Sequence, residues 1–370
     1  MTHYRVLRAV ALCTAALSLS SLGCRTPTSH QQQTSAASAV AAGSTRAPVA
    51  GSAAPSAPDA PDAPDAPLRI AYSDWPGWVA WEIALKKGYF KDAGVAVSFV
   101  WLEYVPSIEA FSEGKVDAVC MTNGDALVAG SSDSASVGIL INDYSNGNDM
   151  LVAQPGILGL ADLKGKKIGV EVGFVDHLLL MEALKSVHLG ESDVAIVNSK
   201  TEQTPELLKA GGVDAIAAWQ PNSGRALDEV PGARAIFTSA NIPGLIYDLL
   251  FVSKKSLARR RADWEKVTRV WFRVVDFIAD PAHHAEAAQI MGARVNLTAD
   301  KYSKLMDGTR LLGASENQKR YQKSADFASV QGSSEIVDRF NVANHVYKEP
   351  VAVDPYFDGT LVEEAVAAKK

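Results

Sequence analysis

Short apolar stretches alternate with amphipathic stretches along most of the chain after residue 67. Residues 95–101 place apolar side chains at every second position, which is typical of a strand with one buried face. Residues 261–278 instead place tryptophan, valine and isoleucine at helical spacing. By these criteria we expect strands at residues 69–72, 95–101, 117–121, 136–142, 168–171, 194–198, 213–218 and 245–253, and helices at residues 76–87, 107–112, 176–187, 204–210, 261–278, 284–291, 299–308 and 333–340.

This order of elements predicts an α/β protein with mostly parallel sheets, because strands and helices alternate throughout. The pattern restarts near residue 150, which indicates a second lobe of similar design. We expect residues 68–150 to form the first part of lobe 1, residues 151–242 to form lobe 2, and residues 243–370 to return to lobe 1 with C-terminal helices. Two such lobes with facing strand-end loops would form a clamshell.

The first 67 residues differ in composition from the rest of the chain. Residues 1–24 combine Arg5 and Arg8 with an apolar run too short to span a membrane, which predicts an export signal. A small residue precedes Cys24, so we expect a lipoprotein signal with Cys24 as the lipidation site; an ordinary secretory signal cleaved elsewhere is the alternative. Residues 25–67 are rich in alanine, proline, serine and aspartate and predict a disordered linker. The expected location is the periplasm, with a lipid anchor in the membrane.

Composition and motifs argue against several classes of function. The net charge of −6 disfavours nucleic acid or an anionic membrane surface as a partner. Cys120 is the one cysteine after Cys24, which excludes an internal disulfide there, and its apolar strand predicts a buried structural role. The sequence has no zinc-ligand set, phosphate-binding loop, dinucleotide fingerprint or nucleophile elbow. We therefore expect a monomeric protein that is not an enzyme and has no cofactor, no metal and no catalytic residues.

The stretch of residues 69–94 is the most informative part of the chain. It predicts a strand, a turn that carries Asp74 and Trp75, and a helix. Open α/β sheets bind ligands at the carboxyl ends of their strands, so this turn is a candidate recognition surface. The alternative role for Asp74 is to cap the helix that follows. Trp78 and Trp81, one and two turns further on, are expected in the core.

Acidic and aromatic side chains recur at the predicted strand ends. They suit a small ligand that is cationic or rich in hydrogen-bond donors, through charge-assisted hydrogen bonds and cation–π contacts. A sulfonate or nitrate would instead require arginine, lysine or many free backbone amides, and Arg225 is the one base near these loops. Asp176 has the alternative role of a helix cap. The expected ligand-binding residues are Asp74, Trp75, Asn123, Asp125, Tyr144, Glu171, Asp176, Trp219, Gln220, Tyr247 and Asp248.

Seven short segments carry a family resemblance: IAYSDWPGW (70–78), TNGDAL (122–127), DYSNGND (143–149), EVG (171–173), DHLLL (176–180), AWQP (218–221) and PGLIYD (243–248). With them, residues 69 to about 355 resemble the periplasmic solute-binding proteins of ABC importers, in the nitrate/sulfonate/taurine-type family. The branch found beside urea carboxylase genes is the most similar. The resemblance implies a type II periplasmic binding protein fold, with two lobes joined by two crossovers and the ligand closed between them. It also implies a urea-like or guanidine-like solute.

The function expected from these features is that of an extracytoplasmic solute-binding lipoprotein. It would capture a small nitrogen-rich solute, urea or guanidine-like, and deliver it to the permease and ATPase complex of an ABC importer. The alternatives are a binding protein for a sulfonate, nitrate or pyrimidine-precursor ligand, an enzyme on the same fold, and a sensory or scaffold lipoprotein without a permease.

Overall fold

The structure is a computed structural model that describes residues 66–131 and 136–368. All of the described residues belong to one compact unit. The expected signal, Cys24 and the expected linker up to residue 65 lie outside the described residues, so export, lipidation and linker stay predictions. Within the described part of the chain, no helix combines the length and the apolar character needed to cross a bilayer.

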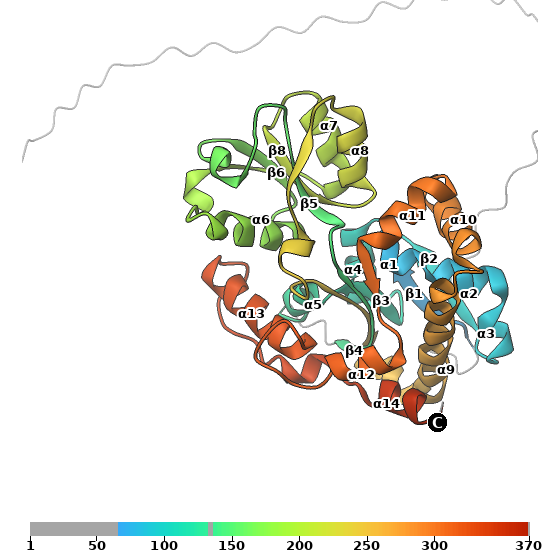
Figure 1. The fold of residues 1–370 in the computed structure, drawn as a ribbon. Coiled ribbons are helices and arrows are strands. Elements are labelled where there is room, and N and C mark those ends of the chain that lie inside the picture. Colours follow the sequence, from blue (N-terminus) through green and yellow to red (C-terminus); the bar gives the residue numbers. More distant parts are fainter. Residues whose placement is uncertain (1–65, 132–135, 369–370) are drawn as a thin grey trace, which may run out of the picture. The chain divides into compact units, whose positions relative to one another are not determined.

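The first sheet has six strands (Figure 1). They are β1 Leu68–Tyr72, β2 Val97–Trp101, β3 Ala118–Thr122, β4 Ser136–Ser145, β10 Tyr247–Ser253 and β11 Thr309–Leu311. Their spatial order is β11–β4–β10–β3–β1–β2. β1 is parallel to β2 and β3, whereas β10 is antiparallel to β3 and β4, and β11 is antiparallel to β4.

The second sheet has five strands and the same mixed design. They are β5 Asp149–Ala153, β6 Lys167–Val170, β7 Ala195–Asn198, β8 Ala215–Trp219 and β9 Arg234–Thr238. Their spatial order is β7–β6–β8–β5–β9. β6 is parallel to β7 and β8, whereas β5 is antiparallel to β8 and β9.

The sheets are therefore mixed, which corrects the expectation of mostly parallel sheets. The chain passes from the first sheet to the second between β4 and β5, and returns between β9 and β10. The outgoing and returning strands lie side by side in each sheet, as the antiparallel pairs β4–β10 and β5–β9. The alternation of elements in a sequence does not reveal this pairing. The expected lobe limits at residues 150 and 242 lie beside these two connections, and the division into lobes itself stays a prediction.

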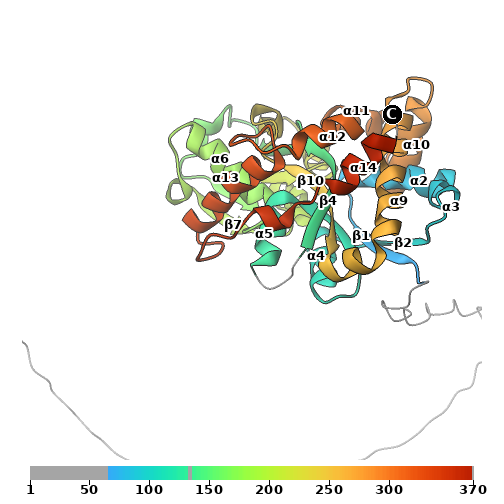
Figure 2. The same cartoon turned by 90° about the horizontal axis from the view of Figure 1, so that it is seen from below.

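The helices cover the sheets as follows. α9 contacts α2, α3, α10 and α14. α7 and α8 pack against β8. α13 lies beside α6 (Figures 1 and 2). The α-helices are α1 Pro76–Val79, α2 Trp81–Lys87, α3 Tyr89–Asp92, α4 Tyr104–Ser112, α5 Asn123–Gly130, α6 Val175–Ser186, α7 Thr204–Lys209, α8 Asn222–Glu229, α9 Lys254–Ala279, α10 His284–Arg294, α11 Ala299–Asp307, α12 Ala314–Arg320, α13 Val330–Ala343 and α14 Thr360–Ala368. The 3₁₀ helices are Leu160–Leu163, Glu191–Asp193, Thr201–Gln203, Ser239–Asn241 and Asp354–Tyr356.

The core beside the first sheet is built from large aromatic side chains. Trp81 of α2 is fully buried, and its ring centroid lies 4.6 Å from that of Trp271 in α9. Aromatic side chains of this size supply much of the apolar area that a core buries. Cys120 is also fully buried, in β3. The predicted core positions of Trp81 and Cys120 are confirmed.

Some elements differ from those that the sequence predicts. The helix expected at residues 76–87 is two helices, α1 and α2, separated at Ala80, and Gly88 ends α2 with a φ of +73°. Residues 143–145, expected in a loop, extend β4, because their backbone pairs with β10 and β11. Asn123 and Asp125, also expected in a loop, begin α5.

Candidate functional site

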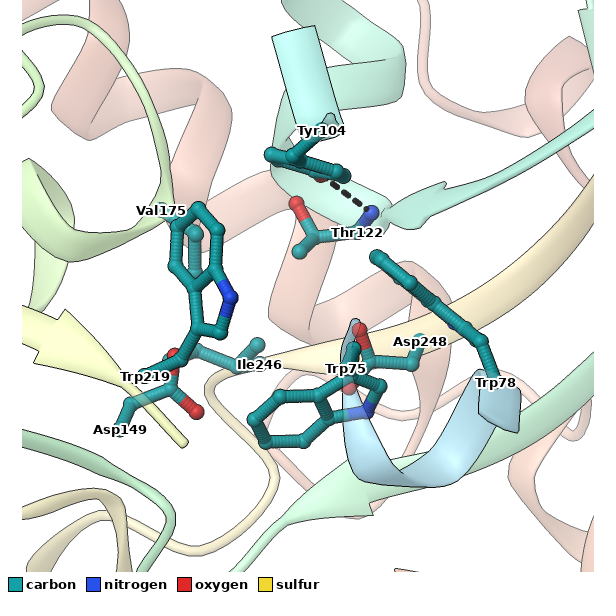
Figure 3. A pocket seen from close by; sticks show the side chains of 9 residues that line it. All are labelled: Trp75, Trp78, Tyr104, Thr122, Asp149, Val175, Trp219, Ile246 and Asp248. Atoms are coloured by element: carbon teal, nitrogen blue, oxygen red, sulfur yellow. Dashed lines mark hydrogen bonds between the residues drawn. The ribbon is translucent and has the colours of Figure 1, made fainter. Parts of the chain in front are cut away.

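A small cavity lies between the two sheets, and its lining side chains come from elements of both (Figure 3). Its volume is about 10 Å³, room for about one water molecule. Sites for drug-sized ligands span about 300–1,000 Å³, so only a small molecule would fit here, and the lining side chains would have to move apart to admit it. The lining residues are Trp75, Trp78, Tyr104, Thr122, Asp149, Val175, Trp219, Ile246 and Asp248.

Four aromatic rings form the walls of this cavity. The ring centroids of Trp78 and Tyr104 are 5.4 Å apart at 25°, a stacked pair, and Tyr104 meets Trp219 edge to face at 5.3 Å. Trp75 meets Trp78 edge to face at 6.4 Å. The expected core position of Trp78 therefore needs correction: the side chain is buried, but it also lines the cavity. Aromatic walls of this kind attract a cation through their ring faces.

Two buried carboxylates complete the lining. Asp149 is the first residue of β5, and Asp248 is in β10; both side chains are buried. In each, Oδ2 receives no hydrogen bond from the described residues. A buried charge without a partner is costly, so such groups normally have a hydrogen bond or a counter-ion. Among the described residues that line this cavity there is no lysine, arginine or histidine to serve as that counter-ion.

A third carboxylate, Asp143, lies directly opposite Asp248 in the β4–β10 pair. Its Oδ1 accepts a 3.0 Å hydrogen bond from Nε1 of Trp75, and its Oδ2 has no donor among the described residues. Like charges directly opposite each other in a sheet repel. Burial raises the pKa of Asp143 to about 8 and that of Asp149 to about 7. Burial, followed by the charge of Asp143, raises the pKa of Asp248 well above its ordinary value.

Asp74 does not line this cavity, although it was expected to contact ligand. Its Oδ1 accepts a 3.0 Å hydrogen bond from Nε1 of Trp219, and its Oδ2 accepts one of 3.2 Å from Nδ2 of Asn222. It does not cap α1, whose N-cap residue is Trp75 without a side-chain hydrogen bond. Burial raises the pKa of Asp74 to about 6, and the hydrogen bond from Trp219 opposes that shift. Asp74 thus holds one of the aromatic walls in place.

A second cavity adjoins the first, since Thr122, Val175 and Ile246 line both. Its volume is also about 10 Å³, and Asn123 and Asp125 are among its lining residues. No lysine, arginine or histidine is found among the described residues around it.

Asp125 links the two cavities. Its Oδ2 accepts a 2.6 Å hydrogen bond from the hydroxyl of Tyr104, and burial raises its pKa to about 7. The side chain of Asn123 is used differently. Its amide nitrogen donates to the hydroxyls of Ser333 and Ser334, and its Oδ1 accepts from the backbone N–H of Tyr247. Asp125 is therefore the better placed of the two for a ligand.

Three further predicted residues lie around the site without lining either cavity. Glu171 accepts hydrogen bonds from the backbone and hydroxyl of Thr201. Asp176 is fully buried in α6, where neither carboxylate oxygen has a donor among the described residues, and burial raises its pKa well above its ordinary value. The helix-cap alternative for Asp176 does not apply, because Phe174 is the N-cap residue of α6. Gln220 is buried beside α8, and its backbone N–H donates to the carbonyl of Asn148.

Tyr144 and Tyr247 pack against each other and line neither cavity. Their ring centroids are 5.9 Å apart, across the β4–β10 pair. The Tyr247 hydroxyl donates to the carbonyl of Phe327 at 2.7 Å. The predicted base, Arg225, also lies outside both linings and pairs with Glu206 at 2.7 Å.

Six residues of the first cavity were missing from the set expected from the sequence: Trp78, Tyr104, Thr122, Asp149, Val175 and Ile246. Asp149 starts β5, and the apolar run that follows it, Met150–Ala153, could have indicated a strand that begins at a carboxylate. Tyr104 starts α4 after β2, so the strand-end rule could have found it. Asp149 and Tyr104 both lie beside elements whose limits the pattern placed imprecisely.

Gly77 allows the carboxylate of Asp143 to lie against α1. A Cβ atom at residue 77 would lie 1.9 Å from Oδ2 of Asp143. We expect Gly77→Ala to lower the free energy of unfolding by about 1–3 kcal/mol, as for other insertions into packed sites. Gly313→Ala is the matched control, because a Cβ there meets nothing within 4 Å. Thermal unfolding measures both, and equal stabilities would contradict the prediction.

Comparison with known proteins agrees with this architecture. The NMT1-like family matches residues 61–292. A protein named "Putative binding protein" from Brucella abortus is 26% identical over 193 residues, which is 51% of this chain and 60% of that protein. A "Putative ABC transporter periplasmic binding protein" from Brachyspira hyodysenteriae is 31% identical over 33% of this chain and 35% of that protein. A "Putative thiamine biosynthesis protein" from Haemophilus influenzae is 29% identical over 53% and 63%. The chain thus matches about 60% of the length of the curated Brucella relative.

Solved structures show the same fold. The alkanesulfonate-binding protein SsuA from Xanthomonas axonopodis pv. citri superposes with a TM-score of 0.64 at 17% identity, over 79% of this chain and 98% of that chain. The desulfurization enzyme DSZB superposes with a TM-score of 0.59 at 16% identity, over 82% and 100%. At such identities the likeness concerns the fold alone, and it confirms the predicted α/β, type II periplasmic binding protein fold. With the family match over residues 61–292, this fold shows that the chain belongs to the NMT1-like family.

Proposed function

We propose that this chain is the solute-binding component of an ABC importer and captures a small nitrogen-rich solute, urea or guanidine-like, between its two lobes. The observation that carries the proposal is the aromatic cavity with unpartnered carboxylate oxygens on Asp149 and Asp248 and no lysine, arginine or histidine among its described lining residues. A guanidinium ion would supply both the missing charge and several N–H donors in one plane. A cationic, guanidine-like ligand therefore fits better than neutral urea.

The transport role is supported by the names of relatives rather than by the site itself. The Brucella relative is named a binding protein and the Brachyspira relative an ABC transporter periplasmic binding protein. The proposed mechanism is a population shift, in which ligand stabilises a closed form that the permease recognises. The proposed location is the periplasm, with a lipid on Cys24 as the membrane anchor and the protein as a monomer.

An anionic ligand is opposed by the charge of the site. Sulfonate and nitrate ligands need positive charge or several free donors. The described residues around both cavities present carboxylates and no positive charge, although Nε1 of Trp78 is a donor without an acceptor among the described residues. An enzyme is a weaker candidate, although DSZB has this fold, because no cysteine, serine or histidine is among the described residues that line either cavity.

A ligand panel tests the proposal. Thermal unfolding of the purified chain should be measured with guanidinium, urea, taurine, nitrate and an aminopyrimidine, because a ligand at 100 times its dissociation constant adds about 2.7 kcal/mol of stability. We expect guanidinium to raise the melting temperature most. Stabilisation by taurine or nitrate alone would overturn the cationic assignment.

A pyrimidine precursor is the second candidate. The Haemophilus relative is named a thiamine biosynthesis protein, and the adjoining cavity would extend the site for a ring with substituents. Stabilisation by the aminopyrimidine, with no response to guanidinium, would favour this candidate.

A further inference from the structure

One carboxylate joins the elements of the two sheets beside the cavity. Asp74 follows β1 of the first sheet, whereas Trp219 ends β8 of the second sheet and Asn222 begins α8. Each oxygen of Asp74 accepts one hydrogen bond from across the gap, from Trp219 at 3.0 Å and from Asn222 at 3.2 Å. Both carboxylate oxygens of Asp74 therefore accept hydrogen bonds from the second-sheet side of the cavity.

The indole that Asp74 holds is a wall of the cavity. Trp219 is buried, and its ring meets Tyr104, which comes from the first-sheet side, edge to face at 5.3 Å. If the second sheet moved away, the cavity would lose this wall. The hydrogen bond from the indole nitrogen to Asp74 holds the Trp219 ring in one orientation. Figure 3 shows this ring among the side chains that line the cavity.

Another contact between the same sides has a different character. Lys301 of α11 and Asp228 of α8 form a 2.8 Å ion pair, but 59% and 67% of their side chains are exposed. Exposed ion pairs contribute little to stability. The bonds of Asp74 are partly buried and involve a carboxylate, so they are the stronger connection.

We infer that Asp74 is a positioning residue that latches Trp219 of β8 and Asn222 of α8 over the cavity and so slows ligand release. It does this without contacting the ligand. The inference rests on the proposed function, because it requires a solute to be enclosed, and it reassigns Asp74 from a ligand contact to a residue that controls closure.

A ligand-free experiment tests the geometry independently of the solute. In a ¹⁵N-tryptophan spectrum of the full chain, Asp74→Ala should shift the indole N–H resonance of Trp219, assigned with Trp219→Phe. Asp228→Ala should leave that resonance in place, because Asp228 pairs with Lys301 on the surface. An unchanged Trp219 resonance in Asp74→Ala would overturn the latch even if no ligand in the panel binds.

A kinetic experiment tests the consequence. With guanidinium as the probe, Asp74→Ala should raise the dissociation rate about tenfold and change the association rate less than about threefold, since affinity differences within one site lie mostly in dissociation. Asp228→Ala should change either rate less than about twofold. An effect of Asp74→Ala confined to the association rate, or no effect on either rate, would refute the latch.

A double-mutant cycle separates a latch from general destabilisation. Asp74→Ala and Asn222→Ala each remove one partner of the same bond, and neither residue lines the first cavity. Their effects on the dissociation rate should be non-additive, with the double variant little worse than Asp74→Ala. Additive effects on the dissociation rate would contradict the assignment. A loss of affinity that only follows the fall in melting temperature of each variant would contradict it as well.

Discussion

Asp248→Asn is expected to weaken guanidinium binding by about 10- to 100-fold. The reason is that a hydrogen bond to a charged group contributes about 1.5–3 kcal/mol, and the substitution removes that charge. The side chain is buried, lines the cavity, and has an Oδ2 without a donor among the described residues. Asparagine has nearly the same shape but no charge, so the walls of the cavity should be preserved. Neutral urea should lose less affinity, because it loses only the stronger hydrogen bond to an ionised acceptor, whereas guanidinium also loses the attraction between opposite charges.

The same substitution should stabilise the protein without ligand. Burial holds the pKa of Asp248 well above its ordinary value, so the buried charge opposes folding when the group is ionised. Calorimetric titration with guanidinium and urea, together with melting temperatures, measures both effects. Asp92→Asn is the control for net charge, because Asp92 is exposed and pairs with Arg273. Equal losses for guanidinium and urea, or a lower melting temperature without ligand, would contradict a charge-recognition role.

The strand-end rule was enough to find part of the candidate site from the sequence. Trp75 follows β1, and Trp219 ends β8, so an assignment of strands alone places both indoles at carboxyl ends of strands. Their side chains line one cavity in the structure. The rule has no information on what a polar side chain does once it is there. Asp74 satisfies the same rule, but its oxygens are used by Trp219 and Asn222.

The antiparallel strand pairs could not be predicted from the sequence pattern. β4 was expected to end at residue 142, because polar residues follow, yet the strand continues through Asp143 to Ser145. A strand that carries a buried aspartate opposite another aspartate conflicts with ordinary packing preferences. Conflicts of this kind between local pattern and global fold are expected at functional sites. They explain why Asp143 appeared to be a loop residue and why Asp149, four residues beyond the end of this strand, was missed.

The shared fold leaves the sign of the ligand charge open, since one fold supports unrelated functions. SsuA is named for an alkanesulfonate, an anion, whereas the cavity of this chain presents Asp149 and Asp248. The charge of the carboxylates that line the cavity is therefore better evidence for the class of ligand than the overall fold is.

Affinity for guanidinium is expected to fall at least about 100-fold between pH 8 and pH 5. Burial raises the pKa of Asp149 to about 7, so at pH 5 this group binds a proton that a cation must displace. For one such group the apparent affinity falls about tenfold for each pH unit below the pKa, and guanidinium itself stays charged over this range. Burial also raises the pKa of Asp248, the other carboxylate that lines the cavity, well above its ordinary value, so a fall of about 100-fold is the smallest change expected. Titration calorimetry at pH 5, 6, 7 and 8 measures this dependence.

The protein without ligand should show the opposite trend. Because burial raises the pKa of Asp149, the folded state binds a proton that the unfolded state has released, between the ordinary pKa of about 4 and the raised value of about 7. The stability contributed by this group is therefore fully present below about pH 4 and is lost as the pH rises to about 7. Asp149→Asn should flatten both trends, since the amide does not titrate. Affinity that is independent of pH in the unsubstituted protein, or a slope unchanged by Asp149→Asn, would show that this carboxylate does not hold the exchanged proton.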